Sequence, residues 1–246
     1  PVRHWRAQDD RLFQRAELMT GLAPLIAVIG CDGSGKSALS VDLLRWIQQE
    51  FGPAESHYLG LGSGQIGSRI KTWPLIGSAI ERALSKRAGQ ARTKGSKIPG
   101  LATALVIYGF SLVRKRRFQR VLSLRRQGFI VVTDRYPQVE VPGFYDGPGL
   151  SAARPDSKLV AALAARERAI YEWMASFVPS LVIRLNVDVE TAFARKPDHA
   201  IELLEAKVAV TPLLKFNGAR IVDIDATMPY AEELALAQNA AAGVID

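Results

Sequence analysis

Cysteine is almost absent from this 246-residue sequence, and histidine is scarce. The single cysteine, Cys31, excludes a disulfide within the chain. None of the three histidines forms a zinc-type cluster with it. A chain that uses no disulfide framework is typical of a reducing compartment, and we expect a cytoplasmic protein.

Acidic residues are missing from one long stretch. Residues 82–126 contain 13 Lys and Arg and no Asp or Glu, whereas the remainder carries 19 basic and 24 acidic residues. The net charge of +8 therefore comes from this basic block. Two interpretations stay open: a solvated helix face, or a surface that contacts a polyanion such as phosphates, lipid headgroups or nucleic acid.

No apolar run is long enough for an ordinary membrane span. The uncharged run at 98–113 has 16 residues, against about 20 for a spanning helix. The RKRR that follows could lie at an anionic membrane surface. We favour a core helix here and leave peripheral membrane contact open. At the N-terminus, residues 1–22 are charged, which does not indicate a secretory signal, and we expect a helical extension there.

Short β-rich runs alternate with helical patterns along the rest of the chain. The expected strands are 25–29, 129–133, 181–187 and 219–225, and the expected helices are 36–50, 101–127, 157–178, 188–195 and 229–242. This alternation predicts an α/β fold with a doubly wound parallel sheet. We find no repeat and no dividing linker, so we expect one domain over 1–246 with a basic insertion at 60–100.

The octet GCDGSGKS at 30–37 matches G-x-x-x-x-G-K-[ST] between a predicted strand and a predicted helix. Glycines let the backbone wrap so that its N–H groups meet phosphate oxygens at a helix N-terminus. We expect ATP and Mg²⁺ as cofactors. The expected ATP-binding residues are Gly30, Gly33, Ser34, Gly35, Lys36, Ser37 and Ala38, with Lys36 bridging the β- and γ-phosphates and Ser37 on Mg²⁺.

The loop also contains a carboxylate, which is electrostatically unfavourable beside phosphates. We therefore expect Asp32 to face away from them and to accept hydrogen bonds from a second ligand, with a local loop hydrogen bond as the alternative. Cys31 is expected to be a small filler.

Asp134-Arg135-Tyr136-Pro137 follows a predicted strand, where ligands collect in open α/β sheets. Asp134 could hold Mg²⁺ through water, and the planar fork of Arg135 could clamp a phosphate. An ordinary ion pair at a strand end is the alternative.

A third basic signal is Arg195-Lys196. We expect a lid segment over residues 195–211 that begins at this pair. A mobile basic segment can close over the transferring phosphoryl group and exclude water. A solvated charge pair is the alternative. His199 and Lys207 are expected at the surface.

Taken in order, these motifs resemble the thymidylate kinase family of P-loop nucleoside monophosphate kinases. The resemblance rests on GCDGSGKS with Asp32, on RQGFIVVTDRYP, on PSLVIRLNVDVETAFAR and on IDA at 224–226. It implies a three-layer α/β/α sandwich with a five-stranded parallel sheet, and a homodimer. It also implies that Asp32 contacts the sugar 3′-hydroxyl, that Arg135 binds the acceptor phosphate and that Arg195 is the lid arginine.

The departures from the family lie on the acceptor side. HYLGLGSG lacks the Arg-Glu-Pro-Gly signature, and LVRKRR replaces the Asp-Arg-Ala-Gln-His-like run that reads thymine. Arg114 falls within about a residue of the base-reading arginine, and we name it as an acceptor-binding candidate on that resemblance.

Three functions remain open. The first is ATP-dependent phosphoryl transfer to a nucleoside monophosphate, dTMP by default, with Lys36, Asp134, Arg135 and Arg195 as catalytic residues. The second is transfer to a saccharide or lipid-linked glycan hydroxyl, which needs a general base, Asp134 or Asp32. The third is a nucleotide-binding regulator or nucleic-acid-dependent ATPase.

Overall fold

The computed structural model describes residues 21–60, 100–143, 146–152 and 154–246. The predicted N-terminal extension and the predicted basic insertion lie almost entirely outside these residues. So do residues 82–99 of the basic block.

The chain divides into two compact units that are interleaved along the sequence. The first comprises residues 1–59, 117–136 and 177–246, and the second comprises residues 60–116 and 137–176. The prediction of one domain relied on finding no linker. One passage between the units falls inside helix α5 (Gly100–Arg126) and another falls directly after strand β3 (Ile130–Asp134), so composition gives no linker signal.

The first unit contains a five-stranded sheet in the order β2-β3-β1-β4-β5. Its strands are β1 (Leu25–Gly30), β2 (Ala54–Tyr58), β3, β4 (Leu181–Asn186) and β5 (Ile221–Asp225), and every neighbouring pair is parallel. The central strand β1 is buried at every position, as its uninterrupted apolar sequence requires. This confirms the predicted α/β fold with a five-stranded parallel sheet.

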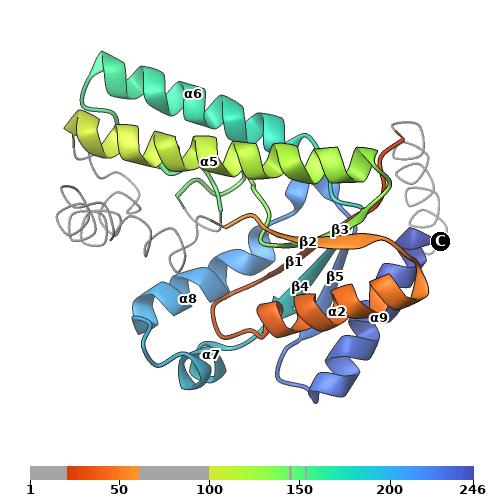
Figure 1. The fold of residues 1–246 in the computed structure, drawn as a ribbon. Coiled ribbons are helices and arrows are strands. Elements are labelled where there is room, and N and C mark those ends of the chain that lie inside the picture. The colour runs from red at the N-terminus through yellow and green to blue at the C-terminus, as the bar shows by residue number, and fades with distance from the viewer. Residues whose placement is uncertain (1–20, 61–99, 144–145, 153) are drawn as a thin grey trace, which may run out of the picture. The chain divides into compact units, whose positions relative to one another are not determined.

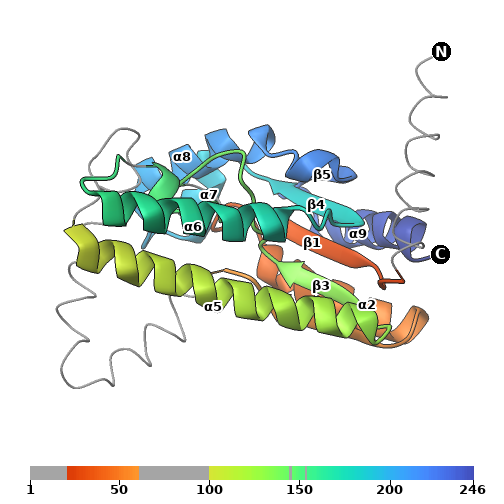
Figure 2. The same cartoon turned by 90° about the horizontal axis from the view of Figure 1, so that it is seen from above.

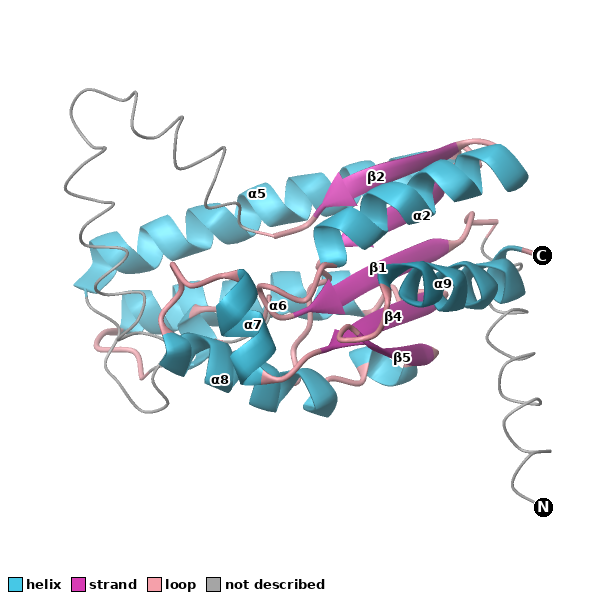
Figure 3. Cartoon of the chain, turned by 90° about the horizontal axis from the view of Figure 1, so that it is seen from below, coloured by secondary structure: helices cyan, strands magenta, loops and turns pink. Residues whose placement is uncertain are grey.

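Helices cover both faces of this sheet. Helices α2 (Lys36–Glu50) and α9 (Tyr230–Ile245) contact each other and lie together on one face (Figure 3). The last turns of α5, from residue 117 onward, lie on the opposite face (Figures 1 and 2). These turns bury Phe118, Val121 and Leu122. The result is three layers within the first unit.

Short helices gather at the carboxyl ends of the strands, where parallel sheets bind ligands (Figure 3). They are α7 (Val189–Arg195) and α8 (Ile201–Val210). Two single turns, η2 (Thr211–Leu213) and η3 (Phe216–Gly218), lead from α8 into β5.

The second unit is described by the first part of α5, the turn η1 (Leu150–Ala152) and helix α6 (Lys158–Ala175). Its small core contains Ala104, Leu150 and Val160. The buried carboxylate of Glu167 accepts hydrogen bonds from Ser111 Oγ and from the Leu150 N–H, both at 2.7 Å. Burial raises the pKa of Glu167. These bonds attach η1 to the two helices.

The uncharged run at 98–113 forms the start of α5 from residue 100. Ala104 and Ser111 are buried, whereas Leu101 and Leu105 on another side of the helix are exposed. Among the described residues, no helix has both the length and the apolar character that a membrane crossing requires.

Candidate active site

The phosphate-loop candidate connects β1 to α2 and depends on two glycines in left-handed conformations. Gly33 has φ +88° and Gly35 has φ +86°, which other residues rarely adopt. Gly35 is the N-cap of α2 and has no side chain with which to cap it. The N–H groups of the first helical turn, together with the positive end of the helix dipole, therefore suit an anion. Of the other predicted loop residues, Gly30 and Ser34 are buried, while Ser37 and Ala38 are exposed.

Lys36 is buried, and its side chain folds back against this loop. Its Nζ donates a hydrogen bond to the carbonyl oxygen of Cys31 at 3.1 Å and lies 3.5 Å from Asp32 Oδ1. Burial lowers the pKa of Lys36, the charge of Arg135 lowers it further, and Asp32 partly offsets both. The ammonium is thus held against the loop, between the Cys31 carbonyl oxygen and Asp32. Cys31 is buried, in agreement with its expected role as a filler.

Ser37, at the start of α2, and Asp134, at the carboxyl end of β3, place two oxygen ligands close together. Ser37 Oγ donates to Asp134 Oδ2 at 3.2 Å, although the two residues are 97 positions apart in the sequence. A hydroxyl and a carboxylate are donors that Mg²⁺ prefers, with phosphate oxygens and water completing its shell. The described residues include no group of three or more His, Cys, Asp or Glu that could hold a metal by itself. These residues therefore fit a metal that is shared with a phosphate ligand.

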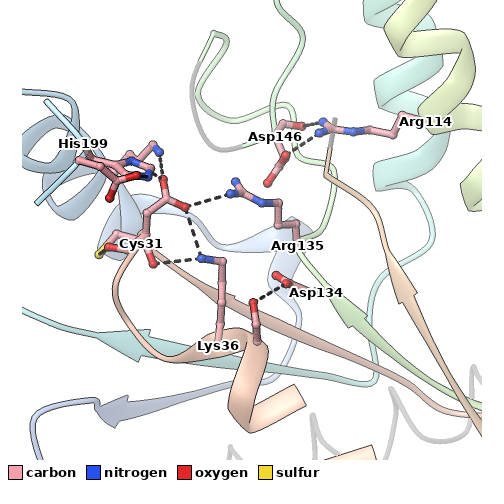
Figure 4. Close-up of polar contacts among 11 residues, drawn as sticks. Cys31, Lys36, Arg114, Asp134, Arg135, Asp146 and His199 are labelled. Carbon is pink, nitrogen blue, oxygen red and sulfur yellow. Dashed lines mark hydrogen bonds and ion pairs between the residues drawn. The ribbon is translucent and has the colours of Figure 1, made fainter. Parts of the chain in front are cut away.

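Asp32 is surrounded by basic side chains. Its Oδ1 accepts a hydrogen bond from Arg135 Nη2 at 3.1 Å, and its Oδ2 contacts Lys207 Nζ and lies 3.7 Å from His199 Nδ1. In Figure 4 the dashed lines from Lys36 and Arg135 meet at one unlabelled carboxylate, which is that of Asp32. Burial would raise the pKa of the Asp32 carboxyl, but Lys207, Lys36 and Arg135 outweigh burial and hold that pKa well below its usual range. Asp32 is therefore a charged centre rather than only a local loop partner.

Lys207 and His199 are predicted to be surface residues rather than catalytic ones, and the structure leaves Lys207 only partly exposed. Lys207 lies on α8, and its side chain forms an ion pair with Asp32 that keeps it 27% exposed. His199 lies in the segment before α8, also beside Asp32. One sequence signal for a role of Lys207 is that it is the only basic residue of α8, IELLEAKVAV. The pattern did not show which face of that helix meets the loop.

Arg135 is held in place by the residue that follows it. Its backbone has φ +72°, an unusual value for a residue with a side chain. Tyr136 is buried, and its ring packs edge-on against Phe118 at 5.8 Å and Phe216 at 6.2 Å. The Tyr136 hydroxyl also donates a hydrogen bond to the Phe177 carbonyl oxygen. This aromatic cluster stabilises the turn that aims the guanidinium at Asp32.

Arg195 is the last residue of α7 and reaches the phosphate-loop candidate. Its Nη1 donates to the Gly33 carbonyl oxygen at 3.3 Å, and its Nη2 donates to the Ala226 carbonyl oxygen at 3.0 Å. The predicted lid thus comprises the end of α7, residues 196–200 and α8. The structure brings Arg195 to the loop, and its catalytic role stays a prediction.

Arg184 fixes the far end of α8, a role that the sequence did not reveal. From β4, its Nε donates to Asp223 Oδ1 at 2.6 Å on the neighbouring strand. Its Nη1 donates to the Leu214 carbonyl oxygen at 3.0 Å and to the Thr211 carbonyl oxygen at 3.3 Å. The chain leaving α8 is therefore bound to the sheet.

Arg114 belongs to the second unit, so its position relative to the phosphate-loop candidate is not described. It is buried, and its guanidinium binds the Asp146 carboxylate and carbonyl and the Tyr171 hydroxyl (Figure 4). Its acceptor-binding role stays a prediction.

Two Escherichia coli (strain K12) proteins are similar to this chain over most of its length. The protein named "Uncharacterized ATP-binding protein YghS" is 47% identical over 211 residues, which are 85% of this chain and 89% of that protein. The protein named "Uncharacterized ATP-binding protein YghR" is 45% identical over 217 residues, which are 88% of this chain and 86% of that protein. The chain belongs to the YghS/YghR family. No protein-family model matches it.

A solved structure shows the fold of this YghS/YghR family member. Deoxyadenosine kinase from M. mycoides, solved with the products dCMP and a flexible dCDP, matches with a TM-score of 0.50 at 13% identity. The match covers 89% of this chain and 100% of the kinase. The chain therefore has a P-loop kinase fold, and the narrower resemblance to thymidylate kinase stays a prediction.

Proposed function

We propose that this chain is an ATP-dependent phosphotransferase whose acceptor carries a phosphate group, as a nucleoside monophosphate does, with dTMP as the first acceptor to test. The observation that carries the proposal is the cluster of cations around Asp32. Lys36, Arg135 and Lys207 all lie on that single carboxylate. Three positive charges against the two carboxylates of Asp32 and Asp134, the second of which also acts on Lys36, suit a ligand that brings further negative charge.

The donor side follows from the loop. Lys36 and the N-terminus of α2 would bind the triphosphate of ATP, the ligand that the names of both relatives carry. Mg²⁺ would be held by Ser37 and Asp134, and when bound it neutralises charge on the donor phosphates. Arg195, on the Gly33 carbonyl, is close enough to the loop to stabilise the transferring group when its side chain turns from the carbonyl to phosphate oxygens.

The transfer itself needs alignment and charge neutralisation more than a base. An oxygen of the acceptor phosphate attacks the γ-phosphorus, and the bond from that phosphorus to the β–γ bridging oxygen breaks as ADP leaves. Arg135 would orient the acceptor phosphate, which is already ionised near neutral pH. No proton needs to be removed.

The charge state of Asp32 bears on one of the two candidate bases, Asp32 and Asp134, for phosphorylation of a hydroxyl. A general base is most effective when its pKa lies near the working pH. The pKa of Asp32 is lowered by its cations, so Asp32 is a poor base near neutrality. This supports a phosphorylated acceptor over a saccharide or glycan hydroxyl for which Asp32 would be the base.

An acceptor panel tests the proposal. The purified chain is given Mg²⁺ and ATP with dTMP, dUMP, other nucleoside monophosphates and sugars, and ADP release is measured together with the ³¹P spectrum of the product. We expect ADP release with a monophosphate and the pair of signals of a new diphosphate. Lys36→Met should abolish turnover, whereas Lys158→Met, which removes an exposed lysine at the start of α6, should not. A phosphomonoester formed on a sugar, or hydrolysis that depends on DNA or RNA, would overturn the proposal.

A further inference from the structure

Two basic side chains from different elements bind opposite oxygens of Asp32. Arg135, directly after β3, lies on Oδ1, and Lys207, on α8, lies on Oδ2. Their side chains are 23% and 27% exposed, whereas that of Asp32 is 14% exposed. The carboxylate is thus the more enclosed partner, and both cations can be reached by a ligand.

Among the contacts described for this cluster, positive charges outnumber carboxylates. Asp32 also lies 3.5 Å from Lys36, so one carboxylate faces three full positive charges, with the His199 ring beside it. Asp134, the other nearby carboxylate, accepts a hydrogen bond from Ser37, and its charge also acts on Lys36, so three cations lie near two carboxylates. Like charges held close together are stabilised by a further anion, and a phosphate group offers several oxygens to planar and point donors at once.

We propose that Lys207 is a phosphate-binding residue of the acceptor site, paired with Arg135, and that Asp32 positions its ammonium. The pairing uses two kinds of donor: a planar guanidinium that fixes orientation, and an ammonium that adds charge. The inference rests on the proposed function in that it assigns the second anion of a phosphotransfer site.

The anchoring of α8 supports this role. Arg184 binds the carbonyl oxygens of Thr211 and Leu214, immediately beyond the helix, and so ties its end to the sheet. Thr211 Oγ1 also donates to the Lys207 carbonyl oxygen at 2.7 Å. The backbone of Lys207 therefore lies next to a point at which the chain is fixed to the sheet. A binding residue needs such a rigid support.

Binding of inorganic phosphate, used as a probe of the acceptor phosphate, tests this role without any turnover. The full chain is first saturated with Mg²⁺ and the non-hydrolysable analogue AMP-PNP, and phosphate is then titrated by calorimetry. We expect Lys207→Met to weaken phosphate binding about tenfold or more, because it removes a charge-assisted contact. Lys158→Met, which makes the same change of charge at an exposed site, should leave it unchanged. Lys207→Arg should restore most of the binding.

A second variant separates binding from support of Asp32. If Lys207 served only as the partner of Asp32, then Lys207→Met would have no further effect once Asp32→Asn had removed the carboxylate. We expect it to weaken phosphate binding about tenfold in that background as well. Equal phosphate affinity in Asp32→Asn and in the double variant would overturn the inference. So would the absence of phosphate binding by the unaltered chain.

The two proposals fail in different ways. If no monophosphate is turned over but phosphate binding depends on Lys207, the proposed reaction is wrong and the anion site stands. If a monophosphate is turned over and Lys207→Met changes neither phosphate binding nor the KM of that acceptor, the reaction stands and the role of Lys207 is wrong.

Discussion

The contact between the phosphate-loop candidate and α7 can be tested with one methyl group. A Cβ added at Gly33 would lie 2.6 Å from the carbonyl oxygen of Ala192 and 3.1 Å from its Cα, both backbone atoms. Real Cβ atoms do not approach so closely, so Gly33→Ala must displace the loop or α7. Gly128 offers a matched control, because its φ of +85° is close to the +88° of Gly33 and a Cβ there meets nothing within 4 Å.

The two substitutions share one energetic cost and differ in the other. Alanine in the left-handed region costs about 1–2 kcal/mol, and we expect Gly128→Ala to lose that much free energy of unfolding. Forcing an extra carbon into packed surroundings costs a further ~1–3 kcal/mol. Gly33→Ala should therefore lose about 2–5 kcal/mol. Because Arg195 of α7 binds the Gly33 carbonyl, affinity for Mg²⁺ and AMP-PNP should also fall in Gly33→Ala and not in Gly128→Ala.

Urea unfolding gives the first quantity, and calorimetric titration with Mg²⁺ and AMP-PNP gives the second. If both variants lose the same free energy of unfolding and keep the same affinity, then the loop does not lie against Ala192 and the site geometry described above is refuted.

Two further predictions concern the carboxylates of the site. Ser37→Ala and Asp134→Asn should each lower the affinity for AMP-PNP about tenfold or more in the presence of Mg²⁺ and much less in its absence, since the Ser37–Asp134 pair is the proposed metal site; equal losses with and without magnesium in titration calorimetry would contradict this assignment. Asp32 should contribute stability only while it is ionised. Its folded pKa lies below the unfolded value of about 3.9, so its contribution is present above that pH and is lost as the pH falls below it. The difference in urea midpoint between the unaltered chain and Asp32→Asn should therefore shrink from about pH 6 to about pH 3. A difference that stays constant would mean that ionised Asp32 contributes no stability through its cations.

The three central strands of the sheet, β3, β1 and β4, can be predicted from the sequence because they are largely buried and apolar. The strand at 25–29, the phosphate-loop pattern and the helix that follows it occur as one local unit. The expected strand at 129–133 is likewise followed directly by the Asp134-Arg135 pair. Local patterns of this kind carry their own physical signals, namely period, glycine placement and charge. The strand β2 was not assigned, because AESHY is polar and largely exposed at the edge of the sheet.

The cluster around Asp32 could not be assembled from the sequence in the same way. Lys207 lies 175 positions from Asp32, and its approach depends on where α8 packs after α7 and residues 196–200. Arg184 was counted only as part of a strand, although its side chain holds the end of α8. Both contacts are products of tertiary packing, which a local pattern does not encode. The interleaving of the two units is likewise set by tertiary packing.

The left-handed backbone of Arg135 sets the stability of the turn against the phosphate-binding role proposed for its side chain. Glycine at 135 would relieve the strained φ, while the aromatic cluster of Tyr136 would still hold the turn. Glycine would also remove the ion pair of Arg135 with Asp32, so the stability of such a variant would report the balance between the two effects. If Arg135 binds the acceptor phosphate as proposed, selection for that reaction would keep a residue that the backbone itself disfavours.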